Sequence, residues 1–134
     1  MATKDRAHEL LQRTYYDCID DYDIPSAVAA LHENIQWSHA QVWKRHDFGM
    51  PLSEHFDGRD EVEAFLSGVV DGLRAAKIRH HIDEMVFDEA TDKGAFLAHV
   101  EGREGSPDAG VQAPFLVWFE LRDDRVSRYT LRPI

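Results

Sequence analysis

The pattern of hydrophobic and polar residues changes from a helical period to a strand period about half-way along the chain. From Lys4 to about Tyr22, apolar residues recur at steps of three and four, which predicts one half-buried helix; they are Leu11, Tyr15, Cys18, Ile19 and Tyr22. Asp23 followed by Ile24-Pro25 is typical of a helix N-terminus. We therefore expect a second helix that ends near Asn34.

A third helix follows a short strand and a long loop. The residues Ile35 to His39 alternate apolar with polar, which favours a strand. Residues 40–56 have no period and contain many turn formers, so we expect a loop there that could act as a lid over a pocket. A helix should start at Asp57-Gly58, because apolar residues then recur at helical spacing: Val62, Phe65, Leu66, Val69, Val70 and Leu73.

After Ala76 the chain has the period of strands. About four runs alternate at period two, and turn signals separate them at Asp92-Lys93-Gly94, Gly105-Ser106-Pro107-Asp108 and Asp123-Asp124. Helices that come early and strands that come late predict an α+β fold, with three N-terminal helices on one face of a strongly curved antiparallel sheet. With 134 residues, the chain fits one domain, 1–134.

Composition narrows the classes of partner. The formal net charge of −10 disfavours binding to nucleic acid or to anionic membrane surfaces. The sequence contains no apolar run of signal-peptide or membrane-spanning length. Cys18 is the only cysteine, so no internal disulfide can form. We expect a cytoplasmic protein.

The first candidate for chemistry is a histidine in the strand that begins at Ile78. One face of this strand carries Ile78, His80, Ile82 and Val86, and the other carries Arg79, His81, Asp83 and Met85. An inward His80 is either a core histidine with its hydrogen bonds satisfied or a base in an apolar pocket, and a carboxylate partner would favour the base. Asp20, near the end of the first helix, is the candidate partner, although periodicity leaves its direction open.

Four segments together resemble the SnoaL-like family of the nuclear-transport-factor-2-like superfamily. They are Tyr15 to Asp23, Ile35 to Trp37, Phe56 to Arg59 and Ile78 to Ile82. The resemblance implies a cone-shaped fold around one pocket. It is greatest to the branch that contains scytalone dehydratase, bile-acid 7α-dehydratase and hexachlorocyclohexane dehydrochlorinase.

That branch carries an Asp at the end of helix one and a His at the start of the strand after helix three. Asp20 and His80 occupy these positions, and Tyr15 matches a helix-one tyrosine of its dehydratases. The resemblance implies that His80 is a general base, that Asp20 orients it, and that Tyr15 donates a hydrogen bond to developing negative charge. Five residues separate Tyr15 from Asp20, which in an α-helix is a turn of about 140°.

Ketosteroid isomerase, another relative of this fold, suggests a second interpretation. Tyr15 falls where its oxyanion tyrosine would be, and His39 falls where its carboxylate base would be. The second oxyanion acid of ketosteroid isomerase aligns with Val117, whose side chain cannot donate a hydrogen bond. Classical steroid isomerisation is therefore not expected.

Four residues are candidates for substrate binding: Trp37, His39, His99 and Trp118. His99 shares a strand face with Glu101, and the dehydratases of the family place a second polar catalytic residue on this strand. A solvent-facing position for His99 is the alternative. Aromatic residues at strand spacing can equally be plain core.

Other chemistries lack their motifs. His80 and His81 project to opposite faces, and no HExxH or paired-cysteine spacing occurs, so no metal is expected. GxSxG, P-loop and GxGxxG motifs do not occur either, and no cofactor is expected.

The leading hypothesis is a cofactor-independent lyase or isomerase, of the dehydratase or elimination type, that acts on a small apolar molecule. The alternative is a non-catalytic ligand-binding or oligomerisation module of the same fold, which includes the accessory subunit of a ring-hydroxylating oxygenase. In either case we expect a homo-oligomer, a dimer or a trimer, because a partner subunit commonly covers the open face of such a sheet.

Overall fold

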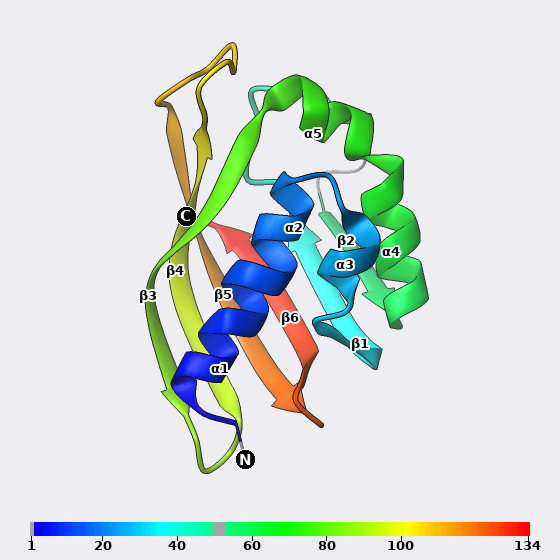
Figure 1. Ribbon diagram of the computed structural model, residues 1–134, viewed down its shortest axis with the longest axis vertical. Coiled ribbons are helices and arrows are strands. Elements are labelled where there is room, and N and C mark those ends of the chain that lie inside the picture. Colours follow the sequence, from blue (N-terminus) through cyan, green and yellow to red (C-terminus); the bar gives the residue numbers. More distant parts are fainter. Residues whose placement is uncertain (1, 50–52) are drawn as a thin grey trace.

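The computed structural model describes residues 2–49 and 53–134, which form one curved sheet with helices over one of its faces (Figure 1). The first helix is continuous over residues 4–20 but has three parts: α1 (Lys4–His8), a π-helical segment η1 (Glu9–Tyr16) and α2 (Asp17–Asp20). Its predicted position is confirmed. The π-helical turn was not predicted.

The second helix, α3 (Ile24–Val28), is shorter than predicted. Asp23 caps it as expected, because its side chain accepts a hydrogen bond from the Ser26 backbone N–H. The predicted continuation to Asn34 is wrong, since strand β1 (Leu31–Ala40) begins at Leu31 and pairs there with Val126. Sheet hydrogen bonds and full burial of Leu31 outweigh the helical pattern at this point.

The predicted loop 40–56 contains a strand. β2 (Ser53–Asp57) pairs antiparallel with β1, so the loop is shorter than expected; residues 50–52 lie outside the described residues. The predicted third helix is confirmed in position but is divided at Val69 into α4 (Arg59–Gly68) and α5 (Val70–Ala76).

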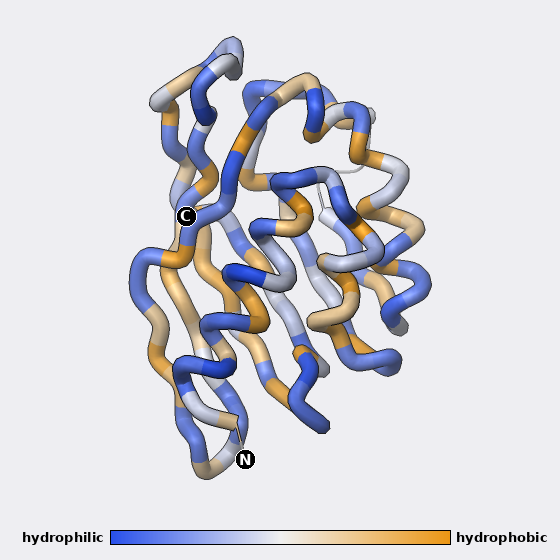
Figure 2. The backbone as a smooth tube through the Cα atoms, viewed as in Figure 1, coloured by the Kyte–Doolittle hydropathy of each residue, from blue (hydrophilic) through white to orange (hydrophobic). Residues whose placement is uncertain are grey.

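Four strands follow, as the alternation predicts: β3 (Ile78–Asp88), β4 (Lys93–Gly102), β5 (Gln112–Arg122) and β6 (Arg125–Pro133). The strand order is β2-β1-β6-β5-β4-β3. All neighbours are antiparallel except β1 and β6, which are parallel, so the sheet is mixed where a purely antiparallel one was predicted. Figure 2 shows hydrophobic and hydrophilic residues alternating along these strands.

A β-bulge in β3 changes which residues point inward. Ile82 pairs with Ala98 and Glu84 pairs with the next residue of β4, so Asp83 is an extra residue. Side chains beyond the bulge exchange faces: Met85 is 4% exposed and Val86 is 65% exposed, the reverse of the prediction. His80 lies before the bulge, so its predicted inward direction is retained.

The core lies between the helices and the concave face of the sheet. Its largest buried side chains are aromatic: Trp37, Tyr15, Tyr16, Tyr129, Phe96, Phe115 and Phe119. None of the helices in residues 2–49 and 53–134 is long and apolar enough to cross a membrane.

Candidate active site

A cavity opens between the helices and the concave face of the sheet. It encloses about 760 Å³ of space, part of which is open to solvent. Its lining is mostly aliphatic and aromatic, and its titratable groups are three tyrosines, two histidines and one glutamate: Tyr15, Tyr16, Tyr129, His39, His80 and Glu54. An apolar cavity with a few convergent polar groups is the usual form of a small-molecule site.

His80 and Asp20 form a hydrogen-bonded pair at one wall of this cavity. Asp20 Oδ1 lies 2.8 Å from His80 Nδ1, and Asp20 Oδ2 accepts the His80 backbone N–H at 2.7 Å. A carboxylate only accepts hydrogen bonds, so we assign the ring proton to Nδ1. Nε2 then carries a lone pair, and no protein group in the described residues binds it. The predicted proximity of Asp20 and His80 is confirmed.

Helix one holds this pair against β3 through a second side chain. Gln12 Nε2 donates to the His80 carbonyl at 3.0 Å, and Gln12 Oε1 accepts the Ile82 N–H at 2.7 Å. β3 is an edge strand, so these backbone groups have no neighbouring strand to bind. Side chains of the helix therefore complete the hydrogen bonding of the strand that carries His80.

Arg103 fixes the end of helix one. Its Nη2 donates to the Asp20 carbonyl and to the Tyr22 hydroxyl, each at 2.7 Å. A cation beside the last carbonyls of a helix is stabilised by the helix dipole. Asp20 is thus held at its backbone as well as at its carboxylate.

Tyr15 lies in the cavity lining, and its hydroxyl oxygen accepts a hydrogen bond from Trp37 Nε1 at 3.0 Å. Burial raises the pKa of Tyr15 above its ordinary range, so the phenol keeps its proton at neutral pH. That proton remains available for donation to a bound molecule. Both Tyr15 and Trp37 lie where the sequence predicted them, at a cavity.

Tyr16 and Tyr129 were missed by the sequence interpretation. Their hydroxyls share a hydrogen bond of 2.6 Å, and burial raises the pKa of both. The Tyr16 ring stacks on the His80 ring, with centroids 5.0 Å apart and planes 7° from parallel. The π-helical segment η1 buries Leu10, Leu11, Tyr15 and Tyr16, which repeat at a spacing of five, so both tyrosines face inward. For Tyr129 the signal was its alternation with Leu131 in β6.

A second pair, His39 and Glu54, lies in the cavity wall formed by β1 and β2. The two residues are direct cross-strand partners, and His39 Nδ1 lies 3.2 Å from Glu54 Oε2. The Glu54 side chain is only 7% exposed, and burial raises its pKa. Burial, with the charges of His80 and Arg132, lowers the pKa of His39 to about 4. The sequence pointed to His39 but missed Glu54, because β2 was not predicted.

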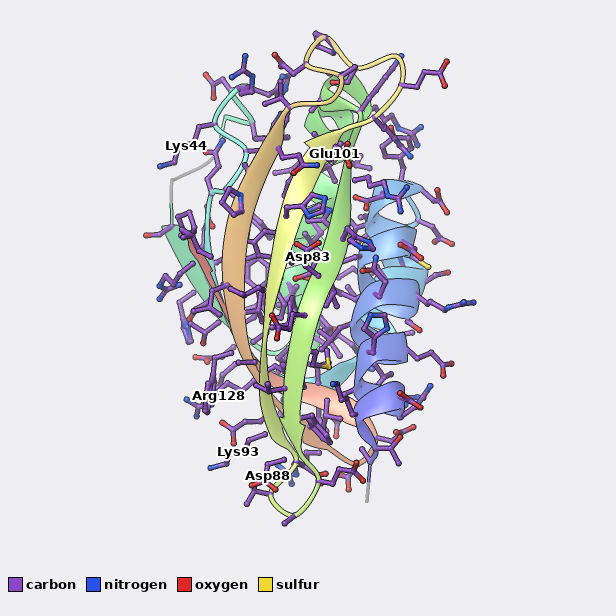
Figure 3. The ribbon with its side chains drawn as sticks, turned by 90° about the vertical axis from the view of Figure 1, so that its left-hand side faces the viewer. Lys44, Asp83, Asp88, Lys93, Glu101 and Arg128 are labelled. Atoms are coloured by element: carbon purple, nitrogen blue, oxygen red, sulfur yellow. The ribbon has the colours of Figure 1, made fainter. Side chains whose placement is uncertain are left out.

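His99 and Trp118, two of the candidates for substrate binding, do not line the cavity, and His99 takes the outward-facing alternative. His99 lies on the outward face of β4, where its Nδ1 is 2.8 Å from Asp83 Oδ2 and its Nε2 is 3.7 Å from Glu101 Oε2. Figure 3 shows Asp83 and Glu101 along the β3–β4 pair. Trp118 is half exposed on the outward face of β5, and Val117 is fully buried core. Strand alternation alone does not say which face a helix layer covers.

The described residues contain no group of three or more His, Cys, Asp or Glu that could hold a metal ion.

The profile of the SnoaL-like domain matches residues 12–129 of the chain. The chain belongs to the SnoaL-like family. A comparison of this SnoaL-like chain with curated proteins finds no significant match.

Solved structures confirm the fold of this SnoaL-like chain. A candidate ketosteroid isomerase from Kribbella flavida is 16% identical, with a TM-score of 0.63, over 97% of this chain and 78% of that one. An NTF2-like protein of unknown function from Burkholderia pseudomallei is 19% identical, with a TM-score of 0.67, over 98% and 92%. A candidate polyketide cyclase from Xanthomonas campestris is 22% identical, with a TM-score of 0.56, over 97% and 91%. At these identities the likeness establishes the fold, and function must be argued from the site.

Proposed function

We propose that this SnoaL-like chain is a cofactor-independent lyase or isomerase, of the dehydratase or elimination type, that removes a proton from carbon in a small, largely apolar molecule. The observation that carries the proposal is the His80–Asp20 pair: His80 lines the apolar cavity, its Nδ1 lies against Asp20, and its Nε2 has no partner among the described residues. A histidine so placed has the geometry of a general base. Buried polar atoms in a protein core usually have a hydrogen-bond partner, so the unpartnered Nε2 favours the base over a core histidine.

Each residue has a defined part in the proposed step. His80 Nε2 takes the proton from carbon, and Asp20 keeps Nδ1 protonated and stabilises the imidazolium that forms. The electron pair of the C–H bond then either forms a double bond and expels a leaving group, or moves onto a carbonyl oxygen. Tyr15 donates its hydroxyl proton in a hydrogen bond to that developing negative charge.

The ring of Tyr16 supports the same step. Stacked on His80, it limits rotation of the imidazole, whose Nδ1 is held by Asp20. Restricting the base to its productive orientation removes an entropic cost from the proton transfer.

The test compares His80→Ala with His81→Ala. We would use 5-nitrobenzisoxazole, an apolar probe from which a base removes a ring C–H proton while the N–O bond breaks, to give a coloured nitrophenolate. Loss of His80 should slow turnover at least about a hundredfold, the usual scale of general base catalysis. His81 points out of the sheet and is half exposed, so its loss should change little.

The same pair of variants separates the catalyst from a binding module. If both variants turn the probe over as fast as wild type, His80 is not a base. A His80→Ala protein that melts several degrees lower yet binds 5-nitrobenzisoxazole as well as wild type would support the ligand-binding alternative, in which His80 serves only packing.

A further inference from the structure

The cavity contains a second hydrogen-bonded pair besides His80–Asp20. His39 lies on β1 and His80 on β3, and β6, β5 and β4 separate these two strands in the sheet. Both histidines nevertheless line the same cavity. The sheet that carries them is curved (Figure 1). A molecule bound between them would have one histidine pair at each side.

The surroundings of the His39–Glu54 pair favour neutral groups. Burial is the main reason that a positive charge on the His39 ring is disfavoured, and His80 from β3, when it is protonated, and Arg132 from β6 also oppose that charge. The Tyr15 and Tyr129 hydroxyls also line the cavity and carry no charge at neutral pH. Burial raises the pKa of Glu54, which favours its carboxylic acid form. When Glu54 carries a proton, that acid donates to His39 Nδ1, and the His39 proton is then on Nε2.

We propose that Glu54 and His39 form a second proton-transfer pair, which protonates the oxygen leaving group of the substrate while His80 removes the proton from carbon. This inference rests on the proposed function and makes it more specific. The substrate would be a small apolar molecule with a hydroxyl or similar oxygen leaving group on the carbon next to the acidic C–H.

The step balances without an imidazolium at His39. His39 Nε2 gives its proton to the leaving oxygen as Nδ1 receives the proton of Glu54 Oε2, so the ring stays neutral and only exchanges tautomers. The C–H and C–O bonds break, a C=C bond forms, and water leaves. Afterwards Glu54 is a carboxylate, His39 carries its proton on Nδ1, and His80 is an imidazolium beside Asp20. Transfer of one proton from His80 to His39 Nε2 through water, while His39 Nδ1 returns its proton to Glu54, restores all three residues.

Two probes that differ in their leaving oxygen test this role. In 5-nitrobenzisoxazole the phenolate leaves readily without a proton, whereas in unsubstituted benzisoxazole protonation of the oxygen assists much more. Glu54→Gln keeps the shape of the side chain but has no proton to pass on. We expect it to slow turnover of benzisoxazole about tenfold more than turnover of the nitro compound, which is a part of the roughly hundredfold or greater effect that general acid catalysis typically supplies.

The matched control is Asp57→Asn. Asp57 lies 3.0 Å from His55, a histidine–carboxylate contact on the same strand pair, but both side chains are exposed to solvent. Its loss should leave both probe rates unchanged. If turnover depends on His80 but Glu54→Gln slows both probes equally, or slows neither, the inference is wrong and the proposed function stands. If wild type turns over neither probe faster than His80→Ala does, the proposed function is wrong, and so is the catalytic role of the second pair.

The tautomer of His39 gives a readout without turnover. Long-range ¹H–¹⁵N NMR spectra distinguish protonation at Nδ1 from protonation at Nε2. As the pH rises and Glu54 ionises, its carboxylate can only accept, so the His39 proton should move from Nε2 to Nδ1. Glu54→Gln has no ionisable group at this position, so its His39 ring should keep the same tautomer as the pH rises. A wild-type ring that keeps one tautomer over the whole pH range in which the protein is folded, or the same change in Glu54→Gln, would show that no such pair exists.

Discussion

At the scale of the residue, two histidines in one cavity differ because of what surrounds them. His80 has a carboxylate that accepts hydrogen bonds from both its ring and its backbone, so a positive charge on its ring has a partner at 2.8 Å. At His39, burial is the largest cause that lowers the pKa of the ring, followed by His80 and Arg132, and burial raises the pKa of its partner Glu54. One wall is therefore suited to receiving a proton, and the other to remaining neutral.

This difference predicts how the free energy of unfolding depends on pH. The pKa of His39 is about 4 in the folded protein and about 6.5 when unfolded, so between these values the unfolded chain binds more protons. Stability should therefore fall as the pH decreases from about 6.5 to about 4, by up to about 3 kcal/mol from this residue. The raised pKa of Glu54 acts in the opposite direction and reduces the net slope.

Urea unfolding of wild type and His39→Gln across this pH range measures the contribution of His39. The variant should lose less stability than wild type as the pH falls. His55→Gln, on the outward face of the same strand pair and half exposed, serves as the control and should keep the wild-type slope. Parallel slopes for wild type and His39→Gln would contradict the prediction.

At the scale of the element, the unit that builds the site is helix one docked on the edge strand β3. Gln12 and Asp20 supply hydrogen bonds to β3 that a neighbouring strand would otherwise make. Because the backbone groups of residues 80 and 82 bind to this helix, the position of His80 depends on the helix. The site is thus an interface between two elements, each of which the sequence identifies separately.

Replacing Gln12 by Leu tests this dependence. The Ile82 N–H and the His80 carbonyl would lose their partners in a buried place, which should lower the free energy of unfolding by about 1–3 kcal/mol. Glu9→Gln, an exposed change on the same helix, should stay within about 0.5 kcal/mol of wild type. Chemical denaturation measures both. If Gln12→Leu were as stable as wild type, the two backbone groups would have other partners.

The sequence predicted the positions of these elements better than it predicted which of their side chains face the cavity. Helix one, the third helix and the four late strands follow from hydrophobic period, and resemblance to a family joined Asp20 to His80. The π-helical segment could not be predicted, because it depends on packing that places Tyr16 against His80. β2 could not be predicted either, since its five residues have little pattern of their own and form a strand only beside β1. Glu54 was missed for that reason.

At the scale of the whole molecule, the outward face of the sheet carries apolar residues that nothing in the described chain covers. Val86 pairs with Ala95, and Ala95 pairs with Trp118, which places these three in one row across β3, β4 and β5. Leu97 and Leu116 form the next row. Trp118 is 50% exposed, Leu97 44% and Leu116 43%. Apolar patches of this kind commonly mark protein interfaces.

We propose that a second copy of the chain covers this face, so that wild type is a homo-oligomer. Replacing Trp118 by Glu puts a charge in the middle of the patch and should give a monomer of 15.4 kDa. Ala64→Glu adds the same charge at an exposed position of α4, on the helical side, and should leave the oligomer intact. Size-exclusion chromatography with light scattering at micromolar concentration distinguishes these states.

The net charge of −10 adds a salt dependence to this prediction. Two copies repel each other at low ionic strength, and salt screens that repulsion while the apolar contact persists. The wild-type oligomer should therefore tighten as salt rises from about 20 mM to about 300 mM, a range over which the screening length falls from above 10 Å to below it. An assembly held by ion pairs would loosen over the same range, and a wild-type monomer at every salt concentration would show that the exposed face has no second copy to bind.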